Sequence, residues 1–185
     1  MQAIPITITF LEMRRRPHAK PLALPHGADG GTHMLLRAHE PPLRFYRYLY
    51  DAVGHPYHWV ARKRWADAEL AAAVHDPKVE ISVLYARGIP AGFFELDFRK
   101  SGECDLAYFG LTPDFTGRRL GPFMLSAAID AAWSREIERM TVNTNTLDHP
   151  RALPLYQRMG FSPYAQARDE IVPISLGEGF GPWNP

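Results

Sequence analysis

The stretch Tyr108–Trp133, YFGLTPDFTGRRLGPFMLSAAIDAAW, organises the predicted fold of this 185-residue chain. It runs as an apolar strand, a turn containing Gly117 and Gly121, and an apolar helix in direct succession. Glycine lets the main chain approach a ligand closely, and the first N–H groups of a helix have no partner within the helix. Arg118 and Arg119 add charge where the helix dipole is already positive. The turn therefore predicts a binding site for a pyrophosphate.

The two most familiar phosphate-binding loops are absent from the sequence. It contains no G-x-x-x-x-G-K-[ST], and no G-x-G-x-x-G with an acidic residue about twenty positions later. The turn instead resembles the motif [QR]-x-x-G-x-[GA] of the GNAT superfamily, the acyl-CoA-dependent N-acyltransferases. The corresponding residues are Thr116, Gly117, Arg118, Arg119, Leu120 and Gly121. Thr116 replaces Gln or Arg, and Arg119 replaces the first motif glycine.

A second stretch, LDHPRALPLYQRMGF, is similar to the closing segment of the same superfamily, N-x-x-A-x-x-L-Y-x-K-x-G-F. The matching residues are Ala152, Leu155, Tyr156, Gly160 and Phe161. His149 stands where Asn is usual, and Arg158 replaces Lys. The two segments occur in the right order and are separated by one helix and one strand, so the resemblance extends over roughly residues 40–165.

The composition predicts one domain over residues 1–185, with residues 1–36 as a loosely assigned N-terminal arm. A hydrophobic content of 46% is ample for a packed core. The 21 basic and 20 acidic residues are spread through the chain, which argues against a nucleic-acid partner. No run approaches the ~18 apolar residues of a membrane span. Cys104 is the single cysteine, and no secretion signal is evident, so we expect a cytoplasmic protein.

The periodicity of the chain predicts an α/β fold with a mixed sheet flanked by helices. The expected elements are a strand at 7–12, an extended segment at 14–32, helices at 43–53 and 67–75, a hairpin of strands 79–86 and 91–99, a strand at 103–111, the helix already described, a strand at 140–146, a closing helix, and a last strand from 161 towards 171–174. In the hairpin, Glu95, Asp97 and Arg99 alternate with apolar residues and predict a solvent-exposed face. The resemblance implies the GNAT fold, whose central sheet is splayed between its fourth and fifth strands.

The closing helix has two features that set its start and end. Pro150 can occupy the first helical position with Asp148 or His149 as the cap, and Pro154 then predicts a kink or a late start. Gly160 is placed to end the helix.

The resemblance also implies a site for the cosubstrate acetyl-CoA, with no metal. Its pantetheine arm would pair with main-chain groups around Phe109 and Leu111 in the gap between the splayed strands. Its pyrophosphate would lie on the turn from Thr116 to Gly121. His149 is assigned to the same site by its position in the closing motif. His55 and His58 have no further candidate ligands beside them, so they do not predict a metal site.

Two residues are candidates for acid–base chemistry. The resemblance implies that Tyr156 faces the departing sulfur, where a phenol of pKa near ~10 can assist a thiolate whose conjugate acid has a pKa near ~8.5. Alternatively, Tyr156 packs in the core with Ala152 and Met159. Asp105 interrupts an apolar strand, and it either helps to deprotonate the acceptor, directly or through a water, or has a structural role.

These patterns together predict an N-acetyltransferase that moves the acetyl group of acetyl-CoA to a primary amine by direct attack. The acceptor would be a small-molecule or peptide amine, and the protein a monomer or homodimer. The alternatives are a catalytically silent CoA-binding regulatory module, which the altered glycine motif would permit, and an interaction protein with an empty cleft.

Overall fold

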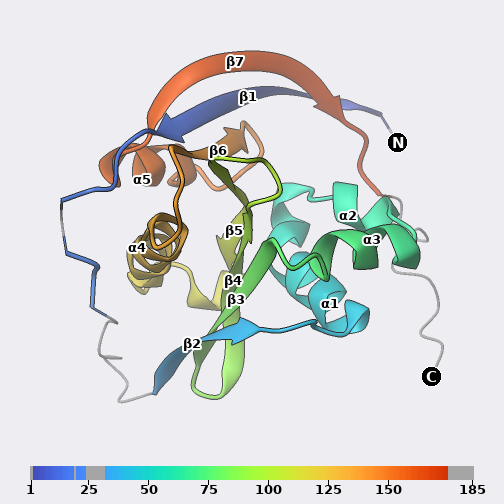
Figure 1. The fold of residues 1–185 in the computed structure, drawn as a ribbon. Coiled ribbons are helices and arrows are strands. Elements are labelled where there is room, and N and C mark those ends of the chain that lie inside the picture. The colour runs from blue at the N-terminus through green and yellow to red at the C-terminus, as the bar shows by residue number, and fades with distance from the viewer. Residues whose placement is uncertain (1, 19, 24–31, 175–185) are drawn as a thin grey trace.

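The computed structural model describes residues 2–18, 20–23 and 32–174 (Figure 1). Its centre is a seven-stranded mixed sheet of order β2-β3-β4-β5-β6-β1-β7. The strands are β1 (Ile4–Met13), β2 (His33–Ala38), β3 (Val79–Ala86), β4 (Ile89–Asp97), β5 (Glu103–Leu111), β6 (Arg139–Asn145) and β7 (Ser162–Ile171). The helices are α1 (Leu43–Gly54), α2 (Ala61–Arg64), α3 (Asp67–Val74), α4 (Leu120–Trp133) and α5 (Ala152–Arg158), with single 3-10 turns η1 (His55–Tyr57) and η2 (Pro113–Phe115).

The helices cover the two faces of the sheet, and each face has its own core. Figure 1 shows α4 and α5 on one side and α1, α2 and α3 on the other. The first core packs α4 and α5 on the sheet and includes Leu96, Leu106 and Met124. The second packs α1 and α3 and includes Tyr46 and Phe93. This arrangement confirms the predicted α/β class with a mixed sheet flanked by helices.

The N-terminal segment contributes more to the sheet than the sequence indicated. β1 lies between β6 and β7 and pairs antiparallel with both, for example Ile8 with Asn145 and with Ala167. β2 was not predicted; it is an edge strand that pairs only with β3, and its Met34 and Leu36 are exposed. A short edge strand needs little hydrophobic alternation, so its sequence signal is weak. The segment expected to be extended has no helix or strand at residues 14–18, 20–23 and 32, and residues 19 and 24–31 lie outside the described residues.

The β3–β4 hairpin corrects two expectations. The turn is only Arg87 and Gly88, with φ of 54° and 83°, so β4 already begins at Ile89. Two positive φ values in a two-residue loop are typical of the tight turns that match the strand twist. The predicted exposed face is also wrong, because Glu95 is 0% exposed. Helix α1 covers that face, and Tyr46 donates a hydrogen bond to Glu95.

The sheet opens between β5 and β6. These strands pair in parallel where residues 103–105 face 139–141. Further along, β5 stays paired with β4 up to Leu111, and β6 stays paired with β1 up to Asn145. Because β2 adds a strand, the fourth and fifth strands of the prediction are the fifth and sixth of the structure. The closing helix begins at Ala152, with Pro154 in its first turn, which confirms the expected late start.

Candidate active site

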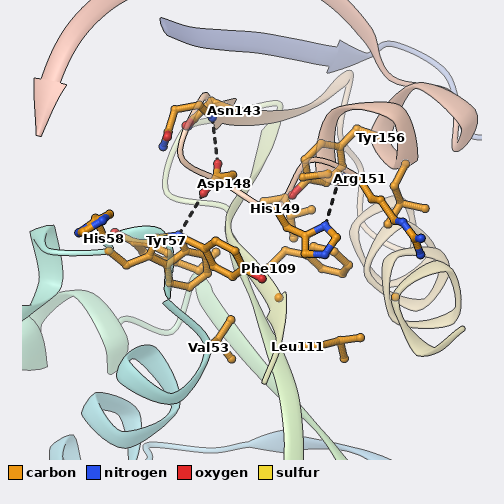
Figure 2. Close-up of a pocket in the computed structure, with 18 of the residues that line it drawn as sticks. Val53, Tyr57, His58, Phe109, Leu111, Asn143, Asp148, His149, Arg151 and Tyr156 are labelled. Atoms are coloured by element: carbon orange, nitrogen blue, oxygen red, sulfur yellow. Dashed lines mark hydrogen bonds between the residues drawn. The ribbon is translucent and has the colours of Figure 1, made fainter. Parts of the chain in front are cut away.

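A cavity of about 530 Å³ lies where β5 and β6 part (Figure 2). It is lined on one side by the second half of β5, the turn before α4, and α5. The other side is formed by the η1 region and by the ends of β6, β1 and β7. Among the candidates from sequence, the lining includes Phe109, Leu111, Thr116, Gly117, Arg119, Gly121, His149 and Tyr156. The fold therefore brings two distant motifs to one cavity.

The turn before α4 and the start of this helix line the cavity. Among the described residues, no side chain caps α4. Thr116 donates its hydroxyl to the Pro113 carbonyl at 2.8 Å, which fixes the start of the turn. Arg118 and Leu120 do not line the cavity: the Arg118 guanidinium lies over the Phe115 ring, and the Leu120 side chain is in the core. These two residues can serve an anion here through their main-chain groups alone.

Arg119 explains how the turn tolerates a missing motif glycine. It is the N-cap residue of α4 and adopts the left-handed conformation, with φ of 61° and ψ of 15°. This conformation suits glycine, and it costs an L-residue roughly 1–2 kcal/mol. The backbone shape that the motif glycine would give is thus retained, and the replacement adds a positive charge at the helix end.

Tyr156 lies on α5 with its side chain buried against the cavity wall. Its exposed fraction is 4%, and its ring packs edge-on against Phe109 and Phe161, each with centroids 6.0 Å away. Burial raises the pKa of Tyr156 well above its ordinary value, and the nearby Asp148 carboxylate raises it further. The phenol is therefore protonated over the whole neutral range, so it can donate a proton or a hydrogen bond but does not act as a phenolate base.

His149 has a defined tautomer when its ring is neutral. Its Nδ1 accepts a hydrogen bond from the main-chain N–H of Arg151 at 3.1 Å, so the ring proton is on Nε2 (Figure 2). The ring also packs edge-on against Tyr57, with centroids 6.2 Å apart. An Nε2–H donor at the cavity wall can do what an Asn side-chain amide would do at the same motif position.

The structure does not bring Asp105 into this cavity. Its carboxylate lies in a second hollow, lined by Asp97, Arg99, Lys100, Glu103 and Thr141. Thr141 donates its hydroxyl to Asp105 Oδ1 at 2.7 Å and so joins β6 to β5 where the two strands pair. Burial raises the pKa of Asp105 above its ordinary value. This geometry supports the structural alternative for Asp105.

We therefore expect Asp105→Asn to keep the parent turnover number and the parent acid-side pH–rate profile. The Asn carbonyl can still accept the Thr141 hydrogen bond. The pKa of Asp105 is raised in the folded protein, so folding favours the protonated carboxyl. This stabilisation is complete below the pKa of the unfolded chain and is lost as the pH rises through the folded pKa. Urea unfolding of the variant should accordingly show stability at pH 7 equal to or above that of the parent. If the pH–rate profile of Asp105→Asn no longer falls on the acid side, Asp105 acts as the base after all.

The opposite wall of the cavity is aromatic and surrounds one carboxylate that the sequence analysis treated only as a helix cap. Trp59 and Tyr108 pack with centroids 5.2 Å apart. Trp59 Nε1 donates to Asp148 Oδ1 at 3.3 Å, while Oδ2 accepts hydrogen bonds from Thr144 Oγ1 and the Asn145 N–H, both at 2.9 Å. Figure 2 shows Asp148 between Tyr57 and the α5 side of the cavity. The only available sequence signal was its place next to the closing-motif residue His149.

A buried charge network supports this aromatic wall from behind. Arg62 Nη2 donates to Glu95 Oε1 at 2.7 Å, and the Tyr46 hydroxyl donates to Glu95 Oε2 at 2.6 Å. The Arg62 guanidinium lies 4.1 Å from the Trp65 ring centroid and 5.3 Å from that of Tyr108. The sequence does not predict this network, because Glu95 alternates with apolar residues as an exposed residue would.

Two further properties concern residues 2–18, 20–23 and 32–174. Among them, no group of three or more His, Cys, Asp or Glu side chains is arranged to hold a metal ion. None of the helices formed by these residues combines the length and the apolarity needed to cross a membrane.

Comparison with known proteins gives one family match and many similar folds. A sequence model of the "Acetyltransferase (GNAT) family" matches residues 39–161. No curated protein matches the sequence.

Three solved structures illustrate the similarity of fold. A GCN5-related N-acetyltransferase from Sphaerobacter thermophilus has 17% identity and a TM-score of 0.63, over 94% of this chain and 55% of that chain. A tandem GNAT protein from the clavulanic acid biosynthesis pathway has 12% identity and a TM-score of 0.59, over 91% of this chain and 55% of that chain. An aminoglycoside acetyltransferase from an uncultured soil metagenomic sample, in complex with sisomicin, has 11% identity and a TM-score of 0.56. The match covers 69% of this chain and 86% of that chain. The chain thus spans about half the length of the first two proteins.

Proposed function

The chain belongs to the Acetyltransferase (GNAT) family, and from this premise we propose that it transfers the acetyl group of acetyl-CoA to a primary amine by direct attack. The observation that carries the proposal is the single cavity that joins the open strand edge of β5, the uncapped start of α4 and the buried phenol of Tyr156. Each of these three parts offers the chemistry that one part of the reaction needs. We also propose that residues 1–185 form one domain.

The residues present fit acetyl-CoA. Main-chain groups of β5 around Phe109 and Leu111 face the gap, where β6 no longer pairs with this strand, and can bind an extended pantetheine arm. The N–H groups from Gly117 to Gly121 and the Arg119 charge can bind the pyrophosphate. A Cβ built on Gly121 would come no closer than 3.7 Å to the protein, so this position is open towards the cavity. His149 can donate from Nε2.

The chemical step needs a nucleophilic amine and a stabilised leaving group. A primary amine of pKa near ~10 is mostly ammonium at pH 7, and only its free base attacks a thioester. The attacking nitrogen forms its bond to the carbonyl carbon as the carbonyl π electrons move to oxygen, and the nitrogen then loses one proton to solvent. The carbonyl re-forms as the carbon–sulfur bond breaks with its electron pair on sulfur. Tyr156 can donate its hydroxyl proton or a hydrogen bond to that sulfur.

The silent-module alternative rested on the altered glycine motif, and the left-handed conformation of Arg119 weakens that reason. Turnover of a panel of amines with acetyl-CoA, followed as release of free thiol, tests catalysis directly. Thermal unfolding with acetyl-CoA tests binding separately, because a ligand that binds only the folded state must raise the midpoint. A raised midpoint without turnover of any amine would favour the silent module. An unchanged midpoint would contradict the proposal.

We expect Gly121→Val to raise the Michaelis constant for acetyl-CoA by roughly 10-fold or more, equivalent to about 1.4 kcal/mol of binding free energy. The added side chain would occupy the space in front of the α4 N–H groups and displace the phosphate. The fold should be preserved, since the nearest atoms to a Cβ there are side-chain carbons of Leu155 and Leu111 at 3.7 and 3.9 Å.

The matched control is Gly121→Ala, which adds one methyl group and should give a smaller rise in the same constant. Initial rates over a range of acetyl-CoA concentrations at saturating amine measure both variants. If Gly121→Val binds acetyl-CoA as the parent does, the assignment of this turn to the pyrophosphate is wrong.

A further inference from the structure

The charged residues that line the cavity are separated by sign. The arginines Arg119, Arg151 and Arg158 come from the start of α4 and from α5 with its preceding residue, the side proposed for CoA. The carboxylates are Asp148, after β6, and Asp169, on β7. No lysine or other arginine of the described residues lines the cavity. The acidic side chains that line the cavity therefore lie on other elements than the arginines.

From this separation we infer that the acceptor is a cationic alkylamine without a carboxylate, and that Asp148 binds its ammonium group. The inference rests on the proposed acetyl transfer and names the acceptor class for that reaction. An acceptor that carries a carboxylate would find no lysine or arginine side chain among the described residues that line its side of the cavity, and desolvating an unpaired carboxylate is costly. A second ammonium group, in contrast, would be attracted by Asp169.

Asp148 is held in place before any ligand arrives. Oδ2 accepts two hydrogen bonds at 2.9 Å, from Thr144 Oγ1 and the Asn145 N–H. From the described residues, Oδ1 accepts only the long bond from Trp59 at 3.3 Å, so it retains a lone pair for an ammonium donor. A charge that is already oriented binds a ligand without paying to order its own side chain.

Asp148 also lies between Tyr57 on the aromatic wall and the α5 side of the cavity, which carries Tyr156 (Figure 2). Its negative charge raises the pKa of Tyr57 on the aromatic wall and the pKa of Tyr156 on α5, in each case after the larger effect of burial. The carboxylate is thus near both the acceptor wall and the proposed proton donor. An amine bound to Asp148 would be next to the thioester end of the cosubstrate site.

The surrounding wall favours an apolar body bearing a positive charge. Tyr57, Trp59 and Tyr108 supply aromatic faces, and such faces attract cations within about 6 Å. Ile6 and Ile171 add aliphatic surface from β1 and β7. An alkyl chain fits these walls. Among the described residues, His58 and Tyr50 are the other titratable side chains on the η1 side.

The test compares three probes with the same five-carbon chain: 1,5-diaminopentane, 1-aminopentane and 5-aminopentanoate. Calorimetric titration of each into the CoA-saturated protein measures binding without turnover. We expect both carboxylate-free amines to bind at least about 10-fold more tightly than 5-aminopentanoate, and kcat/KM with acetyl-CoA to follow the same order. If 5-aminopentanoate binds as tightly as the two amines or more tightly, or if no probe binds, the inference fails.

A variant pair tests the role of Asp148. Asp148→Asn should weaken 1,5-diaminopentane binding at least about 10-fold while the shift in midpoint caused by CoA is unchanged. Asp76→Asn is the matched control, because Asp76 also accepts a main-chain N–H in a turn but lies outside the cavity. Equal binding of the diamine by parent and Asp148→Asn would overturn the inference. Failure of CoA to shift the parent midpoint would instead overturn the proposed function, and the probe comparison on the parent protein needs no variant to fold.

Discussion

Replacement of Arg62 by methionine is expected to lower the free energy of unfolding by about 3–5 kcal/mol. The Arg62 and Glu95 side chains are 6% and 0% exposed, and their Nη2–Oε1 distance is 2.7 Å. A buried ion pair adds little net stability, but removing one partner leaves the other desolvated and unpaired. Methionine fills a similar volume, so the loss measures the stranded charge more than a cavity.

The pH dependence of this loss has a definite sign. Burial raises the pKa of Glu95 even with Arg62 and Tyr46 beside its carboxylate. Without the guanidinium, that pKa must rise further. A raised carboxyl pKa gives stability below the unfolded pKa that is lost as pH rises through the folded pKa. Urea unfolding should therefore show a larger deficit for Arg62→Met at pH 8 than at pH 5.

Two controls separate this effect from loss of any arginine. Arg44→Met removes an exposed arginine on α1, and we expect a change within about 0.5 kcal/mol. The double variant Arg62→Met/Glu95→Leu carries no stranded charge and should recover most of the loss. A deficit below about 1 kcal/mol in Arg62→Met would show that the pair is well solvated in solution.

This network lies directly behind the aromatic wall that we propose for the acceptor. Tyr108 lines the cavity on one side and faces the Arg62 guanidinium on the other. Trp59 and Tyr50 pack on the same ring, with centroids 5.2 and 4.9 Å from it. The buried ion pair thus contacts the aromatic wall from behind through the Tyr108 ring.

The sequence predicted the elements whose signals are local. The apolar stripe of α1, the turn before α4 and the late start of α5 at Ala152 follow from residue spacing and from proline and glycine chemistry, and the structure confirms these elements. The closing motif and the glycine turn could be linked only through a resemblance. No local pattern says that a strand at residues 4–13 will insert between β6 and β7.

The residues that the sequence analysis misjudged are polar residues whose partners are distant in the chain. The sequence pattern predicts that Glu95 is exposed, but in the structure its carboxylate is buried and bonded to Arg62, 33 positions away. Asp105 attracts attention as a carboxylate in an apolar strand, yet its partner Thr141 is 36 positions away and outside the main cavity. Asp148 looks like a helix cap, and its contact with Trp59 spans 89 positions. Pairing across such separations is decided by the folded sheet and cannot be read from spacing.

The remaining prediction concerns the leaving group: we expect Tyr156→Phe to lower the turnover number by roughly 10². Expulsion of a thiolate whose conjugate acid has a pKa near ~8.5 needs only modest assistance. Because burial and Asp148 raise the pKa of Tyr156, full proton transfer is uphill, and a hydrogen bond to the developing thiolate is the main contribution. The same raised pKa keeps the donor protonated, so the parent should show no loss of activity from Tyr156 ionisation up to pH 9.

Phenylalanine retains the ring that packs against Phe109 and Phe161, so the variant should fold and bind acetyl-CoA as the parent does. Single-turnover rates and the Michaelis constant for acetyl-CoA separate the two effects. Tyr164→Phe is the matched control, since Tyr164 is 49% exposed on β7 and lies outside the cavity. If Tyr156→Phe folds correctly and turns over at the parent rate, Tyr156 is a core residue, and the thiolate leaves unassisted or with another donor.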